Sequence, residues 1–284
     1  MFERILVPVD GSDAASAALD HALDIASDRK ASLYLCYVAD TNEPSQTRVG
    51  TEVVDVLEGE GEDIVSDASE RAADRGVAAT TDVVQGATHD AIVDYVESRD
   101  VDLVVMGTHG RDGLERYVIG SVAERVVNDS PVPVLTVRGP GDATATYPYG
   151  SVLVPTDGSA HATTALRQGA AVASRHDAPL HLLTVVDESI LGSDDDRTDR
   201  ARDLLEDAAA TAREAGADEV VTDVRTGSVP REIVSYADLN DIDLVVMGTH
   251  GRNGLDQLLL GSITERVLRT APVPVLTTTG ADDA

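Results

Sequence analysis

The sequence has little of several residue types, and each shortage excludes a class of protein. Among 284 residues, Lys30 is the only lysine, Phe2 is the only phenylalanine, and tryptophan is absent. Cys36 is the single cysteine, so no intrachain disulfide can form, and its apolar neighbours indicate an inert core position. No apolar run reaches the ~18 residues of a membrane-spanning helix, and no signal-peptide pattern precedes the first apolar segment. The sequence therefore predicts a soluble, cytoplasmic protein without a disulfide framework.

Positive charge is also scarce. Acidic residues number 51 against 22 basic ones, which gives a net charge of −29. This balance argues against nucleic acids and anionic membrane surfaces as partners, because both select a basic surface. Many Asp, one Lys and small apolar residues are typical of a salt-saturated cytoplasm, where a Debye length of ~3 Å at 1 M screens self-repulsion. Intrinsic disorder is the alternative, but 42% hydrophobic residues and strong periodicity argue against it.

A ten-residue segment occurs twice, and this repeat organises the chain. Asp102–Arg111 reads Asp-Leu-Val-Val-Met-Gly-Thr-His-Gly-Arg and recurs unchanged as Asp243–Arg252, 141 positions later. In each copy two glycines stand three positions apart, and nine residues then separate the second glycine from a Gly-Ser pair. The chain is therefore two copies of one unit, and each copy has its own glycine-rich loop.

The residue types of this loop suit phosphate. Leu103–Met106 reads as a short buried strand, Gly107 follows at its end, and ligands bind at this edge of an open α/β sheet. Ser121 begins a segment with helical spacing, and the free N–H groups at a helix start favour an anion. The alternative is that the glycines only shape a tight connection, and a duplication would copy structural glycines as well.

Apolar periodicity predicts alternating strands and helices in both copies, and hence a parallel sheet with helices on both faces. We expect a first unit at residues 1–138, a Gly/Pro-rich linker at 139–148 and a second unit at 149–284. The expected strands are Arg4–Val9, Ser32–Val38, Val77–Val84, Asp102–Met106, Val132–Val137, Ser151–Pro155, Pro179–Val186, Glu219–Arg225, Asp243–Met247 and Val273–Leu276. The expected helices are Ala14–Asp28, Asp63–Arg75, Thr88–Ser98, Ser121–Asp129, Thr163–Arg175, Asp199–Ala215, Pro230–Asp238 and Ser262–Thr270.

The first copy is slightly longer than the second. Asp10 matches Asp157 at an offset of 147, six more than the offset of 141 at the glycine loop. The extra residues are expected in Thr41–Gly61, a polar, acidic stretch whose glycines and proline predict a loop leading into the next helix. Asp13 matches Ala160, so the copies also differ just after the aspartate.

Each half resembles the universal stress protein family, of its ATP-binding type. The first half carries Pro8-Val9-Asp10-Gly11-Ser12 and Gly107-x2-Gly110-x9-Gly120-Ser121; the second carries Pro155-Thr156-Asp157-Gly158-Ser159 and Gly248-x2-Gly251-x9-Gly261-Ser262. The likeness covers both halves almost completely. It implies an α/β fold with a five-stranded parallel sheet of order 3-2-1-4-5 in each half, similar to Rossmann-like and adenine nucleotide alpha hydrolase-like folds.

The resemblance also implies the ligand, which is ATP or another adenine nucleotide with Mg²⁺ or Mn²⁺ on its phosphates. The aspartate would lie beside the nucleoside, the second strand would meet adenine, and the glycine loop with its Gly-Ser pair would hold the phosphates. The residues implied for the first site are Pro8, Asp10, Val38, Met106, Gly107, His109, Gly110, Arg111, Gly120, Ser121 and Val122. Those for the second are Pro155, Asp157, Val185, Met247, Gly248, His250, Gly251, Arg252, Gly261, Ser262 and Ile263. The family further implies pairing of the two units through their fifth strands, with a homodimer and an unknown protein partner left open.

These residue types also have ordinary structural explanations. Asp10 and its match Asp157 could be turn or cap residues. His109 could be a solvated loop residue, although imidazole can donate to phosphate, and Arg111 could be a surface arginine rather than a charge-assisted phosphate contact. Met106 is of a type that fills gaps in cores. We find no Walker lysine motif, no Gly-x-Gly-x-x-Gly, no catalytic acid and base paired near the loop, and no metal-binding cluster.

Three functions compete on this sequence. The first is an ATP-binding regulatory stress protein with little or no catalysis. The second is a slow ATPase or nucleotidyl-transfer enzyme on the same scaffold, since fold does not fix function. Pro8–Ser12 lacks the Ser-Gly-Gly-x-Asp-Ser-like loop of ATP pyrophosphatase-type enzymes. The third is a structural stress dimer without nucleotide, against which both intact glycine loops count. The sequence favours the first function.

Overall fold

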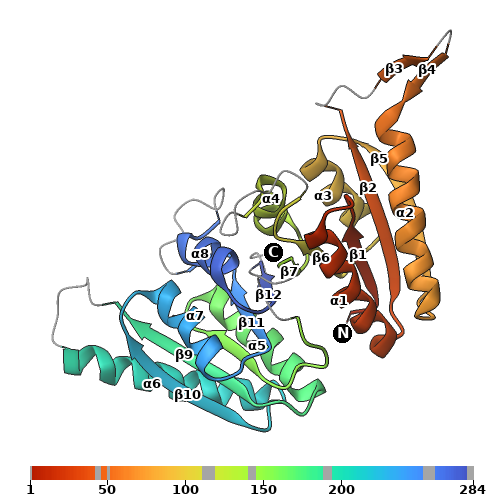
Figure 1. Ribbon diagram of the computed structural model, residues 1–284. Helices are drawn as coiled ribbons and strands as arrows, with labels where there is room; N and C mark the ends of the chain where they lie inside the picture. Colours follow the sequence, from red (N-terminus) through yellow and green to blue (C-terminus); the bar gives the residue numbers. More distant parts are fainter. Residues whose placement is uncertain are drawn as a thin grey trace. The chain divides into compact units, whose positions relative to one another are not determined.

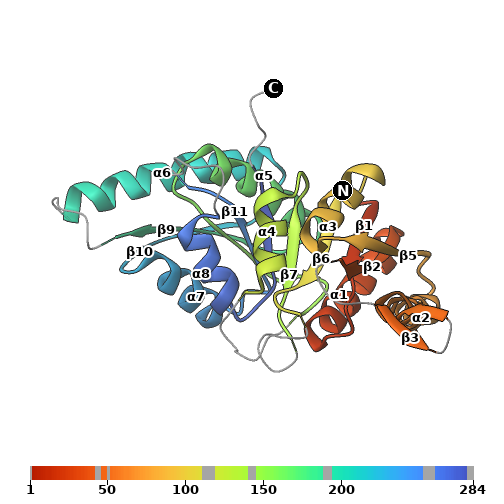
Figure 2. The same cartoon turned by 90° about the horizontal axis from the view of Figure 1, so that it is seen from above.

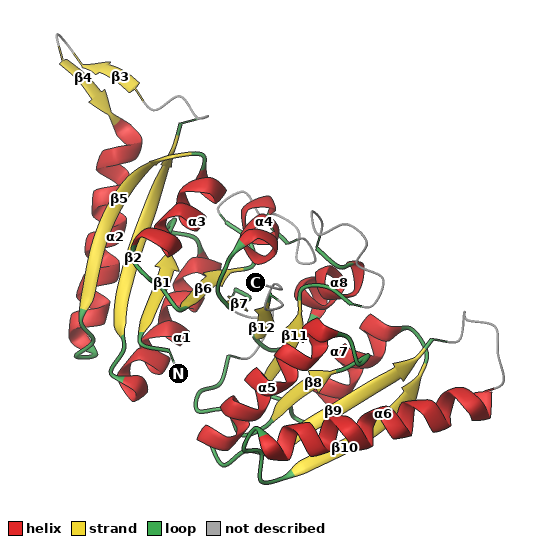
Figure 3. Cartoon of the chain, turned by 180° about the vertical axis from the view of Figure 1, so that it is seen from behind, coloured by secondary structure: helices red, strands yellow, loops and turns green. Residues whose placement is uncertain are grey.

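The chain folds into two compact units, Met1–Pro140 and Gly141–Ala284. The computed structural model describes residues 2–41, 46–49, 52–110, 119–139, 145–187, 194–251 and 260–279 (Figure 1). Each unit is a parallel sheet with helices on both faces, as Figure 3 shows for strands in yellow and helices in red. Among the described residues, no helix combines the length and apolarity needed to cross a membrane.

The first unit has the expected strand order. Five of its described strands pair in parallel in the order β5-β2-β1-β6-β7, which is 3-2-1-4-5 when these five are numbered along the chain. The predicted sheet is thereby confirmed. Its elements are β1 (Arg4–Pro8), α1 (Asp13–Arg29), β2 (Ser32–Asp40), β3 (Gln46–Val49), β4 (Glu52–Asp55), α2 (Val56–Asp74), β5 (Ala79–Gly86), α3 (Thr88–Ser98), β6 (Leu103–Gly107), α4 (Ser121–Asp129) and β7 (Val134–Val137).

The second unit repeats this topology. Its described strands pair in parallel in the order β10-β9-β8-β11-β12, again as predicted. Its elements are β8 (Val152–Pro155), α5 (Ala160–Arg175), β9 (Leu180–Val186), α6 (Asp194–Glu214), β10 (Val220–Thr226), α7 (Val229–Leu239), β11 (Leu244–Gly248), α8 (Ser262–Thr270) and β12 (Val275–Thr278). Within this unit, Figure 2 shows α5 and α6 on one face of the sheet and α7 and α8 on the other.

The core of each unit lies between the sheet and these helices. In the first unit, α1 packs on β1, β6 and β7, while α2 packs on β2 and β5. The central strands are continuous apolar runs because both of their faces are covered. Ile5, Leu6 and Leu103 are fully buried, and small Ala18 and Ala22 let α1 lie close to the sheet. This packing fixes the start of α1 next to the end of β6.

The stretch expected to be a loop in the first unit contains ordered structure, so that part of the prediction is wrong. β3 and β4 form an antiparallel hairpin, and α2 begins at Val56 instead of Asp63. Gly61, which was interpreted as a loop residue, lies inside α2, where a Cβ would stand 2.4 Å from the Tyr37 ring on β2. A close helix–strand contact therefore requires this glycine, and the local signal was misleading.

The length difference between the copies falls in this stretch. Asp40 to Gly76 spans 36 positions (76 − 40), whereas the matching Asp187 to Gly216 spans 29 (216 − 187). The first unit is therefore seven residues longer between these positions. The second unit has one extra residue between Gly216 and β10, so the net difference is the six residues seen in the sequence offsets. In the second unit the helix also begins early, at Asp194.

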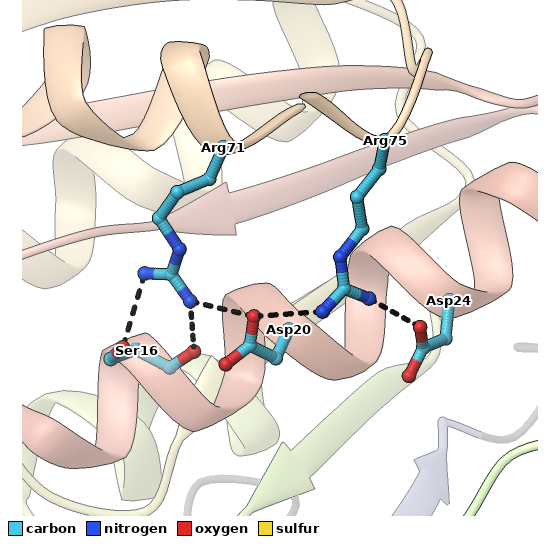
Figure 4. A network of polar contacts seen from close by, with 5 residues as sticks. All are labelled: Ser16, Asp20, Asp24, Arg71 and Arg75. Carbon is cyan, nitrogen blue, oxygen red and sulfur yellow. Dashed lines mark hydrogen bonds and ion pairs between the residues drawn. The ribbon is translucent and has the colours of Figure 1, made fainter. Parts of the chain in front are cut away.

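Arg71 of α2 and Arg75, directly after its last residue, join that helix to α1 (Figure 4). Arg71 donates to the Ser16 hydroxyl at 3.1 Å and to the Ser16 carbonyl at 3.3 Å, and it pairs with Asp20 at 2.7 Å. Arg75 reaches Asp20 at 3.4 Å and also pairs with Asp24. The cluster therefore stabilises the packing of α1 against the C-terminal end of α2.

Candidate functional site

The site predicted for the first unit lies where the strand order reverses. From β1 the chain crosses in one direction to β2 and β5, and later in the other direction to β6 and β7, while β1 and β6 pair side by side. Asp10 follows β1 by two residues, and Gly107 ends β6. The carboxyl ends of neighbouring strands at this point are where doubly wound α/β proteins bind ligands.

The aspartate after β1 forms a turn that starts α1. The Ser12 N–H donates to Asp10 Oδ1 at 2.9 Å, and Gly11 takes the left-handed region with φ at 79°. Ser12 then caps α1, because its Oγ accepts from the Ala15 N–H at 3.1 Å. The turn explanation considered for Asp10 is therefore correct for one carboxylate oxygen, and Ser12 is the N-cap residue of α1.

The second unit repeats the turn with the same geometry. Asp157 Oδ1 accepts from the Ser159 N–H at 2.9 Å, and Gly158 has φ of 76°. Ser159 caps α5 by accepting from the Ala162 N–H at 3.2 Å. Both aspartates are half-buried, each with one oxygen committed to its turn. The duplicated motif thus folds twice into the same local structure.

The first glycine of each loop has a structural reason. A Cβ at Gly107 would stand 2.8 Å from the Ala14 carbonyl carbon, and one at Gly248 would stand 2.8 Å from His161 Cβ. A side chain at either position would push the first turn of the following helix away from the sheet. This supports the interpretation of these two glycines as packing residues.

The second glycine of each loop connects the two sequence motifs. A Cβ at Gly110 would lie 2.6 Å from Asp10 Oδ2, and one at Gly251 would lie 3.1 Å from Asp157 Oδ2. The glycine loop therefore comes directly against the aspartate turn, 100 residues away in the first unit (110 − 10). The site's two predicted halves are brought together in both units.

The loop returns to the start of the next helix. The Gly120 N–H donates to the Thr108 carbonyl at 2.7 Å, and the Gly261 N–H donates to the Thr249 carbonyl at 3.0 Å. Glycine is the N-cap residue of α4 and of α8, so the cap has no side chain to occupy the first free N–H groups. Those donors and the helix dipole favour an anion at this point. Ser121 and Ser262 are exposed there, as are Ile263 and, in part, Val122.

The histidine of each loop is oriented by the preceding threonine. Thr108 Oγ1 and His109 Nδ1 are 3.0 Å apart, as are Thr249 Oγ1 and His250 Nδ1. The contact holds the Nδ1 edge of each ring towards the threonine hydroxyl. His250 additionally meets the ring of His161 on α5, with ring centroids 5.4 Å apart. The sequence analysis did not single out His161. The alignment that matches Asp13 with Ala160 could have drawn attention to it, because His161 directly follows Ala160 and the two copies differ there.

The remaining predicted residues lie around this contact. Pro8 and Pro155 end their strands, and Val38 lies two positions beyond Cys36, the register partner of Pro8. Val38 and its counterpart Val185 are half-buried near the ends of β2 and β9. Met106 and Met247 are each 5% exposed, so their side chains are core residues within β6 and β11. Arg111 and Arg252 lie outside the described residues.

The described part of the chain groups no set of side chains suited to a resident metal ion. His, Cys, Asp and Glu side chains there form no group of three suited to a metal ion. Cys36 is 1% exposed, and burial together with Asp82 raises the pKa of its thiol to about 12, so it is no nucleophile at neutral pH. Tyr95 donates to Asp82 at 2.5 Å, and burial and this hydrogen bond raise the Tyr95 pKa. The arrangement can position an anion at the starts of α4 and α8.

The fold and the paired Asp-turn and glycine-loop contacts define a tandem, doubly wound α/β protein of the adenine nucleotide alpha hydrolase-like class. The model of the universal stress protein family matches residues 1–138 and 148–278. The chain therefore belongs to the universal stress protein family.

Individual relatives agree with this membership. The chain is 30% identical over 234 residues to a universal stress protein of Mycobacterium tuberculosis, covering 77% of each chain. It is 36% identical over 144 residues to one of Methanocaldococcus jannaschii, which spans 49% of this chain and 84% of the relative. A solved universal stress protein from Archaeoglobus fulgidus matches 98% of both chains with a TM-score of 0.74 and 22% identity, which shows a shared fold.

Proposed function

We propose that each unit binds an adenine nucleotide, ATP in the first instance, and that the protein is a nucleotide-dependent stress-response module with little or no catalysis. The observation that carries the proposal is the contact of Gly110 with Asp10 and its repeat at Gly251 and Asp157. It joins a carboxylate suited to nucleoside hydroxyls to a glycine loop suited to phosphates. The contact lies at the sheet position where this fold class binds ligands.

The donor set fits a nucleotide that brings its own metal ion. Backbone N–H groups at the starts of α4 and α8 would meet the phosphates, with Arg111 and Arg252 as further donors. Because no three metal-ligating side chains are grouped among the described residues, Mg²⁺ or Mn²⁺ would be held mainly by phosphate oxygens. That ion would neutralise phosphate charge in a chain of net charge −29. The half-buried carboxylates of Asp10 and Asp157 would fix the nucleoside end.

The first experiment is nucleotide content followed by titration. The protein is purified in molar salt, denatured, and its released nucleotides are identified by chromatography and mass. The emptied protein is then titrated with ATP and Mg²⁺. We expect about two ATP per chain, with one site weakened in Gly110→Ala and the other in Gly251→Ala. Gly59→Ala is the control, because a Cβ at Gly59 meets no atom within 4 Å.

Two outcomes would contradict the proposal. Absence of both copurified nucleotide and ATP binding in molar salt would reduce the loops to structural connections and favour an interaction protein. Turnover of ATP at ordinary enzyme rates, ~1–10³ s⁻¹, would instead make the protein an ATPase or nucleotidyl-transfer enzyme. Slow residual hydrolysis would leave the regulatory function in place.

We also propose, from the family resemblance, that the two units pair through their fifth strands β7 and β12 in the cytoplasm. Paired strands protect their amides, whereas free edge strands exchange them quickly. Hydrogen–deuterium exchange on the full chain tests this. Amides of Val134–Val137 and Val275–Thr278 should exchange as slowly as those of the central strands and more slowly than those of β5 and β10. Exchange as fast as in β5 and β10 would contradict pairing.

Light scattering in molar salt gives the oligomeric state, and affinity capture under stress would seek the partner protein.

A further inference from the structure

The two candidate sites differ at one position beside the glycine loop. Aligning the aspartate turns at an offset of 147 places Ala14 opposite His161 (161 − 147 = 14). Both residues lie in the first turn of the helix that follows the turn, and both pack against the first glycine of their loop. The first unit thus presents a methyl group where the second presents an imidazole.

The extra imidazole lies within the loop–turn contact of the second site. Its ring and that of His250 have centroids 5.4 Å apart and planes inclined by 48°. Gly251, next to His250, lies against the Asp157 carboxylate, and Gly261 at the start of α8 would place a Cβ 3.6 Å from the Cα of His250. The two histidines are therefore surrounded by the groups assigned to nucleotide binding. Both histidines are half-buried, so part of each residue stays accessible to a ligand.

The chemistry of an imidazole pair depends on what faces it. Imidazole exchanges a proton near neutral pH, and two protonated rings in contact repel each other. A polyphosphate beside them stabilises the protonated forms, because opposite charge within a few ångströms favours the charged state. Among the described residues, Asp157 is the carboxylate next to the pair's loop, while Glu265 on α8 is paired with Arg269. Asp157 supplies one negative charge to both the empty and the occupied site.

We propose that His161 is an additional phosphate-binding residue of the second unit, that it acts together with His250, and that nucleotide binding there takes up more protons than in the first unit. The inference rests on the proposed function and deepens it, because it makes the two sites unequal. The second site binds ATP more tightly as the pH falls towards about 6, whereas the first site, with His109 alone, responds less.

Isothermal titration of the full chain with ATP tests this. Titrations in two buffers of different ionisation enthalpy, at pH values of about 6 and 8, count the protons taken up. His161→Ala gives the second unit the residue of the first, and Ala14→His makes the reciprocal change. We expect proton uptake to fall in His161→Ala and rise in Ala14→His. At about pH 6, the second-site affinity of His161→Ala should fall by up to about 10-fold, with a much smaller change at about pH 8.

Two further variants separate proton uptake from folding. His161→Gln keeps a polar side chain that cannot be protonated, and it should lose the proton uptake while retaining a folded second unit by circular dichroism. His176→Gln, at the other end of α5, should leave proton uptake unchanged. If wild type and His161→Ala bind ATP with equal proton uptake and equal pH dependence, the inference is overturned and the proposed function stands. If the wild-type chain binds no ATP at either pH, the proposed function itself fails.

Discussion

Gly110 lies against the carboxylate of Asp10 so closely that a methyl group at position 110 would stand 2.6 Å from Oδ2. In the second unit the same construction at Gly251 gives 3.1 Å to Asp157 Oδ2. One glycine of the loop pattern is thus explained by an aspartate far away in the sequence, and the contact is tighter in the first copy.

This difference predicts unequal effects of one substitution. Gly110→Ala forces Asp10 to move, and overpacking of ~1–3 kcal/mol should weaken ATP binding at the first site roughly 5- to 150-fold. Gly251→Ala should weaken the second site less, because its contact is longer by 0.5 Å (3.1 − 2.6). Titration of each variant with ATP gives both affinities. Equal losses, or none, would show that the glycine–aspartate contact does not control binding.

Two glycines of α2 provide a matched test of packing. Gly61→Ala should destabilise the first unit by about 1–3 kcal/mol, because its Cβ would stand 2.4 Å from Tyr37 Cδ1. Gly59 lies in the same helix, but a Cβ there would have no neighbour within 4 Å. Gly59→Ala should therefore stabilise the helix by up to about 1 kcal/mol. Urea unfolding in molar salt measures both. The double variant Gly61→Ala with Tyr37→Leu should recover part of the loss, and equal behaviour of the two glycines would contradict the close contact.

His21 predicts a specific acid sensitivity of the first unit. It is 2% exposed in α1, and burial lowers its pKa from 6.5 to about 4. The unfolded chain then binds the proton more tightly than the folded chain, so this contribution is complete above about pH 6.5 and is lost as the pH falls to about 4. At about pH 5 the loss is about 2 kcal/mol.

The matching position in the second unit is Gln168, which offers a substitution already tolerated by this fold (168 − 21 = 147). His21→Gln should remove the extra acid sensitivity without changing that of the second unit. Urea unfolding of both chains between about pH 5 and 7.5 measures the difference. The same pH dependence in wild type and variant would mean that His21 is readily protonated in the folded state.

Salt should stabilise the fold and weaken its surface ion pairs. A net charge of −29 repels itself at low salt, so the free energy of unfolding should rise between about 0.1 and 2 M KCl. Arg71→Ala removes the contacts to Ser16 and Asp20 and should cost about 0.2–1 kcal/mol at about 0.1 M KCl, and less at molar salt. Arg202→Ala, which removes only an exposed pair with Asp199, is the control and should cost less. Stability that falls with added salt would argue against adaptation to a saline cytoplasm.

Several features of the site could be predicted from the sequence because their signals are local. The apolar run before Gly107 and the Asp-Gly-Ser turn each specify a strand end followed by a helix start. Their position on neighbouring strands follows from the topology rules for parallel sheets. The loop predicted at Thr41–Gly61 was wrong because the deciding contact is not local. Glycine usually indicates a loop, but Gly61 lies in a helix where a distant side chain occupies the space that a Cβ would need. Nothing near Gly61 in the sequence indicates Tyr37.

The sequence by itself determined the duplication, the parallel sheet of each unit, and the spacing that places a glycine loop beside a helix start, because periodicity and backbone preferences act over a few residues. Only the tertiary structure decided which distant groups touch. Gly110 meets Asp10, Arg71 meets Ser16 and Asp20, and His250 meets His161 across 89 positions (250 − 161). Such contacts depend on how helices settle on the sheet, which is a property of the packed core and is not contained in any short segment of the chain.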